Sequence, residues 1–251
     1  MSGTVVTTWE NGVRTLTLNR PHRLNAIDQQ LITDLLSALS EAHADPKTRA
    51  IVLRGNGRAF CSGDDLIDYP NHSQNEKIAR RFLEDLQDVT RQIVFGEKVV
   101  VGAVHGWAVG GGLEWSIDCD LLLMAEGTRC FFPETRYGMI VTGGVTALLP
   151  RIVGLQQARG LILLGDRFDA QQALAMGLCW RVLPEESLFA EAQKVAERIA
   201  ELPERGVRDL KRIVNRADQA ALEEALALEL EAVVPAFLDP DSAARIAAFK
   251  D

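Results

Sequence analysis

The first half of the chain alternates between short apolar segments and longer segments with helical periodicity. Residues 5–9 and 13–18 are typical of strands and lie on either side of Asn11-Gly12, a dipeptide that favours tight turns, so they predict a β-hairpin. Asp28 then stands where it can cap a helix whose apolar face runs along residues 31–42.

Two further strands are predicted from continuous apolar runs at residues 50–54 and 99–104. Apolar residues with helical spacing follow each run, at residues 78–93 and 112–117. Strands that alternate with helices in this way predict an α/β core with largely parallel strands. Ligands of such sheets bind at the loops beyond the carboxyl ends of the strands, so we expect the site in the glycine-bearing loops that follow these two strands.

Beyond Pro150 the pattern is mostly helical. The segments with helical periodicity are residues 155–164, 170–176, 185–199, 207–217 and 222–237, with one apolar strand at 178–182. Their apolar stripes are broad enough to cover the core or to bury a subunit interface. We therefore expect an α/β core over residues 1–190 and a C-terminal helical region over residues 191–251.

The composition narrows the class of protein. With 251 residues, 47% of them hydrophobic, the chain is long enough for one large core, and its net charge of −8 argues against a general nucleic-acid-binding surface. The four cysteines lack Cys-x-x-Cys spacing, which favours free thiols in a reducing cytoplasm. No signal-peptide pattern and no apolar run of ~20 residues occurs, so we expect a soluble, cytoplasmic protein.

The most informative stretch is Gly110-Gly111-Gly112, between a predicted strand and a predicted helix. Glycine permits a positive φ or a close approach to a ligand, and the first amides of a helix are unpaired donors at the positive end of its dipole. Such a turn suits a developing negative charge. A tight turn without a ligand is the alternative, whereas dinucleotide binding fails because Trp115 stands where the third glycine is needed.

Two carboxylates accompany this turn. Glu114 lies between Leu113 and Trp115, and Glu134 follows Phe132-Pro133. A glutamate is usually a solvated surface charge, but apolar neighbours raise the pKa of a carboxyl group, which suits general acid–base chemistry near neutral pH.

The other residues that could act as a nucleophile, a base or a metal ligand have weaker support from the sequence. Ser62 lacks the Gly-x-Ser-x-Gly pattern and a histidine partner that a nucleophile needs, and His105 is interpreted as structural. The remaining histidines are scattered without metal-ligand spacing, so no metal site is expected. Asp64-Asp65 is interpreted as a loop cap or a solvated pair.

Several short motifs occur along the chain in an order that is typical of one protein family. They are Asn19-Arg20-Pro21 with Leu24-Asn25-Ala26, Ala59-Phe60-Cys61-Ser62-Gly63 with Asp65-Leu66, Gly106 with Ala108-Val109-Gly110-Gly111-Gly112 and Glu114, Cys119-Asp120, Pro133-Glu134, and Leu149-Pro150-Arg151 with Gly154. In this order they make the chain similar to the crotonase superfamily, the enoyl-CoA hydratase/isomerase family, over nearly its whole length.

The resemblance implies a crotonase (ClpP-like) fold, which is a superhelical core of repeated β-β-α units followed by a C-terminal helical trimerisation region. It implies a homo-oligomer, either a trimer or a dimer of trimers. The substrate it implies is an acyl-CoA thioester, with coenzyme A as part of the substrate and no metal or prosthetic group. The thioester oxygen would accept hydrogen bonds from the backbone amides of Ser62 and Gly111. Glu114 and Glu134 match the two glutamates with which the family's hydratases hold water and pass protons.

The same resemblance implies a set of residues that bind coenzyme A or the acyl group. They are the backbone at Arg23 and Leu24, the segment Ser62, Gly63, Asp64, Asp65 and Leu66, the turn residue Gly110, and, from the C-terminal end, Phe249 and Lys250, which reach a neighbouring subunit's cofactor. The chain also departs from its relatives, with Asp64 in place of the usual alanine and Val141-Thr142 in place of Pro-Gly. Trp115 and Phe131 are bulkier than usual.

The function expected from these residues is reversible hydration of a 2-enoyl-CoA to a 3-hydroxyacyl-CoA. Double-bond isomerisation and acyl-CoA hydrolysis are alternatives within the same fold. A relative that binds acyl-CoA or RNA without catalysis is a third possibility, and the intact pair of glutamates and the negative charge weigh against it.

Overall fold

The computed structural model describes residues 3–216 and 219–249, and its main sheet has six strands. In spatial order the strands are β1 (Val5–Glu10), β2 (Val13–Leu18), β3 (Ala50–Gly55), β4 (Val99–Val104), β6 (Leu121–Ala125) and β9 (Arg181–Leu183). β1 and β2 form the predicted hairpin, whose turn residues Asn11 and Gly12 both have positive φ. The other neighbours in the sheet pair in parallel, which confirms the predicted α/β core.

A second, smaller sheet was not predicted. It contains β5 (Trp107–Val109), β7 (Arg129–Phe131) and β8 (Phe168–Asp169), which pair in this order. Strands of two or three residues are too short for a periodic pattern to reveal. Their importance is positional, because β5 directly follows β4 and leads into the triple-glycine turn.

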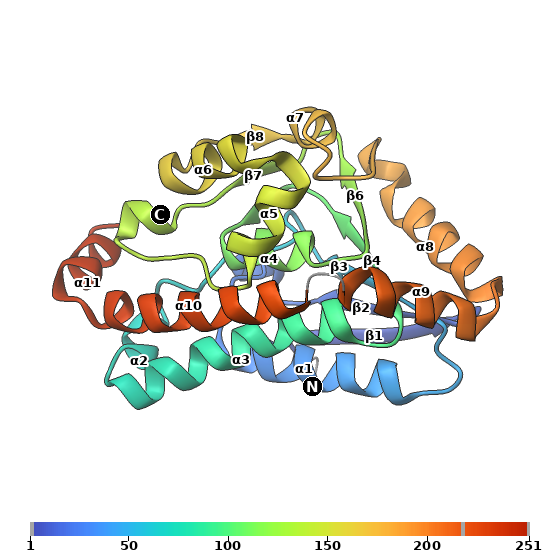
Figure 1. The fold of residues 1–251 in the computed structure, drawn as a ribbon, viewed down its shortest axis with the longest axis horizontal. Coiled ribbons are helices and arrows are strands. Elements are labelled where there is room, and N and C mark those ends of the chain that lie inside the picture. Colours follow the sequence, from blue (N-terminus) through green and yellow to red (C-terminus); the bar gives the residue numbers. More distant parts are fainter. Residues whose placement is uncertain (1–2, 217–218, 250–251) are drawn as a thin grey trace.

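Helices surround both sheets (Figure 1). They are α1 (Gln29–Ala44), α2 (Tyr69–His72), α3 (Glu76–Phe95), α4 (Gly111–Ile117), α5 (Val145–Val153), α6 (Leu155–Leu164), α7 (Ala170–Ala175), α8 (Glu185–Glu201), α9 (Glu204–Arg216), α10 (Gln219–Leu238) and α11 (Pro240–Ala247), with short 3-10 turns η1 (Pro21–Arg23) and η2 (Glu134–Tyr137). The Asp28 side chain caps α1 by accepting a hydrogen bond from the Leu31 amide at 2.8 Å, as predicted.

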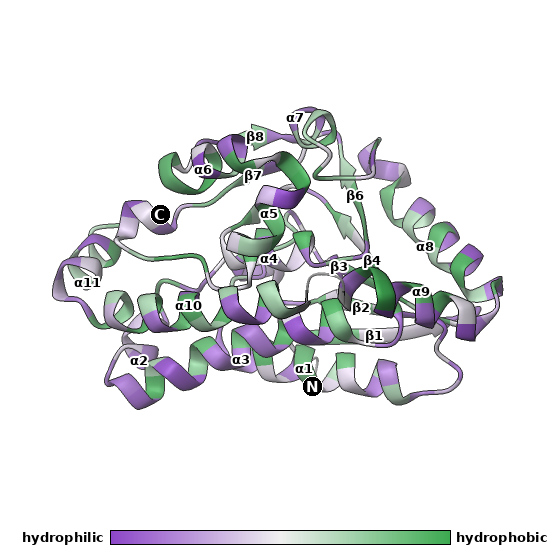
Figure 2. Cartoon of the chain, viewed as in Figure 1, coloured by the Kyte–Doolittle hydropathy of each residue, from purple (hydrophilic) through white to green (hydrophobic). Residues whose placement is uncertain are grey.

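The sheet is covered on both faces, as a parallel sheet requires. Leu35 of α1 and Leu86 of α3 belong to the large core on one face, whereas Leu188 and Val195 of α8 pack with Val101 on the other. The expected boundary after residue 190 falls inside α8, because the apolar stripe of this helix belongs to the sheet. Figure 2 shows that α3 and α8 each carry hydrophobic and hydrophilic residues, as expected for helices with one buried face.

The C-terminal helices also join the main core. α10 lies along α3, and Phe237 near its end is buried in the large core. The Phe237 carbonyl accepts a hydrogen bond from the Tyr69 hydroxyl at 2.5 Å, which ties α10 to α2. These contacts place α10 close enough to the sheet for its side chains to reach the loops beyond α4.

Candidate active site

Three loops meet at the carboxyl edge of the sheet, after β2, β3 and β4. The Ile27 amide donates to the Gly63 carbonyl and the Asp65 amide donates to the Ile27 carbonyl, both at 2.8 Å. On the other side, the Cys61 amide donates to the Trp107 carbonyl at 3.0 Å. The middle loop is therefore bonded on both sides, and the loops in which the sequence predicts the site converge at this edge of the sheet.

Asn25 fixes the shape of the first two loops. Its φ is 56°, and its buried side-chain amide donates to the carbonyls of Asn56, Ala59 and Phe60 at 2.9, 2.8 and 3.1 Å. The Asn25 side chain thus supplies hydrogen-bond donors to carbonyls that a neighbouring strand would otherwise pair with. The motif contained Asn25, but nothing in the sequence revealed this role.

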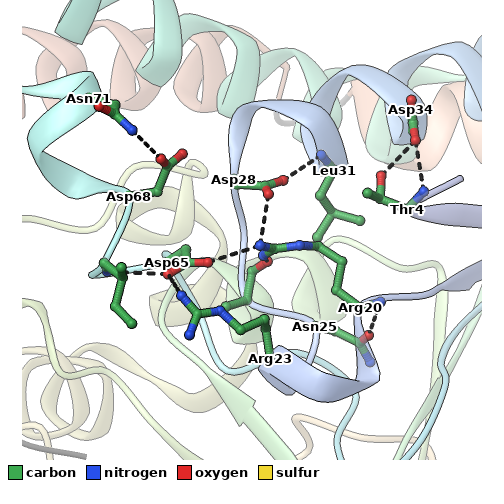
Figure 3. Close-up of polar contacts among 12 residues, drawn as sticks. Thr4, Arg20, Arg23, Asn25, Asp28, Leu31, Asp34, Asp65, Asp68 and Asn71 are labelled. Atoms are coloured by element: carbon green, nitrogen blue, oxygen red, sulfur yellow. Dashed lines mark hydrogen bonds and ion pairs between the residues drawn. The ribbon is translucent and has the colours of Figure 1, made fainter.

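An ion-pair network supports the same region (Figure 3). The Arg20 guanidinium contacts the carboxylates of Asp28 and Asp65 at 2.8 and 3.0 Å, and Arg23 contacts Asp65 at 3.3 Å. Asp65 also accepts a hydrogen bond from the Ile67 amide at 3.2 Å. The buried Asp65 carboxylate, expected among the substrate contacts, therefore joins the loops after β2 and β3.

The three glycines of the triple-glycine turn differ in how much space surrounds them. Gly110 has a φ of 49°, and a Cβ built on it would lie 2.5 Å from Glu134 Oε1. A Cβ on Gly112 would lie 2.6 Å from Cys61 Sγ, a separation that atoms do not tolerate. A Cβ on Gly111 would meet only Ile27 Cδ1 at 3.1 Å and Asp64 Oδ1 at 3.4 Å.

The tight packing at Gly112 gives a stability prediction. We expect Gly112→Ala to lower the free energy of unfolding by about 1–3 kcal/mol, because the added methyl group overlaps the buried Cys61 side chain. Urea unfolding monitored by circular dichroism measures this change. Gly160→Ala is the matched control, since a Cβ there meets nothing within 4 Å, and an equal loss in both variants would contradict the explanation.

Gly111 is the first residue of α4. The first hydrogen bond of this helix runs from the Glu114 amide to the Gly110 carbonyl at 2.9 Å, so the Gly111 amide comes before the helical hydrogen bonds begin.

The second expected donor to the thioester oxygen was the Ser62 amide. That amide already donates to the Leu24 carbonyl at 3.1 Å, so the expectation for Ser62 is wrong. Two residues later, the Asp64 amide has no acceptor within the described part of the chain.

Glu114 lies on α4 and is only 2% exposed. Its carboxylate accepts hydrogen bonds from the Thr142 amide at 3.1 Å and from the Gly143 amide. Burial raises the pKa of Glu114 well above its usual value, and the charges of Glu134 and Glu229 raise it further, while the two amides oppose this shift.

Glu229 of α10 holds the other side of the same loop. Its buried carboxylate accepts hydrogen bonds from the Gly144 amide at 2.7 Å, from the Thr146 amide at 3.0 Å and from the Thr146 hydroxyl at 2.5 Å. The loop between η2 and α5 is therefore clamped between two carboxylates from different helices. Sequence reasoning missed Glu229, which lies 85 residues from Gly144.

Glu134 is the first residue of η2 and is half-buried. Its Oε2 atom is buried and has no hydrogen-bond partner, whereas its Oε1 atom lies against the turn at Gly110. Burial raises the pKa of Glu134 to about 8, and the charge of Asp64 also raises it. The charge of Glu134 also acts on Glu114, and Glu134 Oε1 lies against Gly110, so the structure brings the two carboxylates and the turn together.

The other expected contact residues divide into two groups. Those brought together at the turn and its neighbouring loops are Arg23, Leu24, Ser62, Gly63, Asp64, Asp65, Leu66 and Gly110. Phe249 lies at the opposite end of η2, 51% exposed, with its ring edge-on to Tyr137 at a centroid distance of 6.0 Å. Lys250 lies outside the described residues.

Within residues 3–216 and 219–249, no cluster of three or more histidine, cysteine, aspartate or glutamate side chains could hold a metal ion. None of the helices in this part of the chain is both long and apolar enough to span a membrane.

Comparison with known proteins places these features in a family. The sequence profile described as enoyl-CoA hydratase/isomerase matches residues 8–250. The mitochondrial enoyl-CoA hydratase of Pongo abelii is 36% identical over 239 residues, which cover 95% of this chain and 81% of the relative. The 1,2-epoxyphenylacetyl-CoA isomerase of Escherichia coli (strain K12) is 34% identical over 226 residues, which cover 88% of this chain and 85% of the relative.

Solved structures agree with the sequence comparison. The crystal structure of an enoyl-CoA hydratase/isomerase from Mycobacterium paratuberculosis matches with a TM-score of 0.94 and 28% identity, covering 99% of both chains. The expected crotonase fold, with its mostly parallel sheet and helical C-terminal region, is thereby confirmed.

Proposed function

The chain belongs to the enoyl-CoA hydratase/isomerase family, and from this premise we propose that it hydrates a 2-enoyl-CoA to a 3-hydroxyacyl-CoA. The observation that carries the proposal is the position of two carboxyl groups, Glu114 and Glu134, beside a turn with unpaired backbone amides. Both carboxyl groups have a raised pKa, which suits proton transfer near neutral pH.

The amides of Asp64 and Gly111 are the proposed binding site for the thioester oxygen. Addition at the β-carbon transfers electron density onto this oxygen and forms an enolate. Two fixed N–H donors, one of them at a helix start, stabilise the enolate where it forms, and one such donor typically contributes ~10²–10³ in rate. The Asp64 amide takes the place that the family resemblance implied for the Ser62 amide.

The structure favours different roles for the two glutamates. Burial raises the pKa of both glutamates, but the Glu114 carboxylate accepts two amide hydrogen bonds that oppose this rise, so we assign Glu114 as the base that takes a proton from water. The hydroxide equivalent adds to the β-carbon, and the proton of Glu134 is delivered to the α-carbon. One molecule of water is added overall, and the proton left on Glu114 returns to Glu134 through solvent before the next turnover.

The remaining parts of the proposal concern the rest of the substrate and the assembly. Backbone atoms at Arg23 and Leu24 would contact coenzyme A, which enters as part of the substrate without a separate cofactor. Phe249 and Lys250 would approach the coenzyme A of a neighbouring subunit in a trimer or a dimer of trimers. We further propose that the protein acts in the cytoplasm.

A panel of enoyl-CoA thioesters in ¹⁸O-labelled water tests the proposed reaction. Crotonyl-CoA and longer, branched and aromatic enoyl-CoAs are incubated with the protein, and the products are analysed by mass spectrometry. Hydration places ¹⁸O on the β-carbon of an intact thioester. Isomerisation, the alternative suggested by the family description, would move the double bond without adding oxygen, and hydrolysis would place ¹⁸O in a free carboxylate. Either outcome without β-hydroxylation would overturn the proposal.

A further inference from the structure

A third carboxylate, Asp64, lies in the site in addition to the two glutamates. Its Oδ1 atom is 3.4 Å from the position of a Cβ built on Gly111, and Glu134 Oε1 is 2.5 Å from one built on Gly110. The two carboxyl groups therefore lie against adjacent residues of one turn.

Asp64 has no counter-ion in the described part of the chain. Its neighbour Asp65 is paired with Arg20 and Arg23, whereas the Asp64 side chain has neither an ion pair nor a hydrogen bond among these residues. The adjacent Glu134 Oε2 atom is buried and equally without a partner. Two carboxyl groups that lie against adjacent residues of one turn, with no cation between them among the described residues, do not both ionise readily.

We propose that Asp64 is a positioning residue that keeps a proton on Glu134 at neutral pH, so that Glu134 can act as the acid. This inference rests on the proposed hydration, in which Glu134 delivers the retained proton to the α-carbon.

The protonation of the groups around Glu134 agrees with this assignment. Burial raises the pKa of Asp64 to about 6, so Asp64 is mostly ionised at pH 7.5, while Glu134, with a pKa of about 8, is mostly protonated. Glu114 of α4 is the third carboxyl group in the site, and Glu229 adds negative charge behind it. On η2 itself Tyr137 and Arg136 are the nearby titratable groups, and Arg136 donates to the Gly165 carbonyl at 2.8 Å.

Direct titration of Glu134 tests the inference. Protein labelled with ¹³C at the glutamate side-chain carboxyl is titrated by NMR, and the Glu134 signal is identified by its loss in Glu134→Gln. In Asp64→Asn the pKa of Glu134 is expected to fall by roughly one unit, as removal of a nearby charge predicts. The basic limb of the hydration rate against pH should move down by the same amount, which is about a tenfold lower rate at pH 9.

Two variants serve as controls. Asp64→Glu keeps the charge and should leave the titration near that of the wild type. Asp68→Asn removes a carboxylate of the same loop that binds Asn71 and His72, and should not move the Glu134 signal. An unchanged titration in Asp64→Asn would overturn the inference. Because NMR requires no turnover, a protein that fails to hydrate any enoyl-CoA would refute the proposed function while the titration still reports on Asp64.

Discussion

Replacing Glu114 or Glu134 by glutamine is expected to lower kcat for hydration by about 10³-fold in each case. Glutamine keeps the shape of the side chain but can neither take a proton from water nor deliver one to the α-carbon, and positioned acid–base groups typically contribute ~10²–10⁴ in rate. The two losses should not multiply in the double variant, because both groups serve one addition reaction. Steady-state kinetics on the best substrate of the enoyl-CoA panel measures the effect.

In the same glutamine variants, acyl-CoA binding and protein stability are not expected to fall as kcat does. A saturated acyl-CoA, which cannot react, should bind the variants within a few-fold of the wild type.

The pKa of Glu134 in the folded protein is about 8, against 4.5 in the unfolded chain, so the wild type loses stability as pH rises between these values. Glu134→Gln lacks this loss and should be at least as stable as the wild type at pH 8. Glu224→Gln, on an exposed part of α10, is the control, and variants at 114 and 134 with wild-type rates would contradict the assignment.

Replacing Gly111 by proline is expected to lower kcat a further ~10²–10³-fold beyond the effect of Gly111→Ala. Proline removes the N–H group that we assign to the thioester oxygen, and proline is well tolerated at the first position of a helix, where Gly111 lies. Alanine adds a comparable Cβ beside Ile27 and Asp64 but keeps the N–H group. The comparison therefore isolates one hydrogen-bond donor.

The comparison needs a folding control as well as kinetics. Thermal unfolding of both Gly111 variants shows whether α4 still forms, and kcat is then compared at saturating substrate. Equal rates for the proline and alanine variants, with both folded, would show that the Gly111 amide does not stabilise the enolate.

The sequence was most informative where patterns are long or chemically unusual. Residues 99–104 and the spacing within 78–93 identified a buried strand and a helix, and the structure has them as β4 and α3. Helices α5 and α11 were not predicted, since Pro150 lies inside α5 and α11 follows the proline-containing end of α10 closely. Local patterns could not reveal these elements because tertiary packing stabilises them.

In the candidate site, too, some features follow from local sequence and others depend on contacts between distant segments. Glu114, Glu134 and the triple-glycine turn could be chosen from their sequence neighbours, and the fold brings them together. The choice between the Ser62 and Asp64 amides depends on whether the Leu24 carbonyl reaches Ser62, which is a contact between distant parts of the chain. The contacts of Glu229 with the loop after η2 are of the same kind, and no periodicity encodes them.

The most direct test of the account is a crystal structure with acetoacetyl-CoA, a thioester without a double bond to hydrate. The account predicts that the thioester oxygen lies about 2.7–3.2 Å from the backbone nitrogens of both Asp64 and Gly111, with the β-carbon facing Glu114 and Glu134. A thioester oxygen bound away from these two nitrogens, or carboxyl groups turned away from the acyl group, would contradict it.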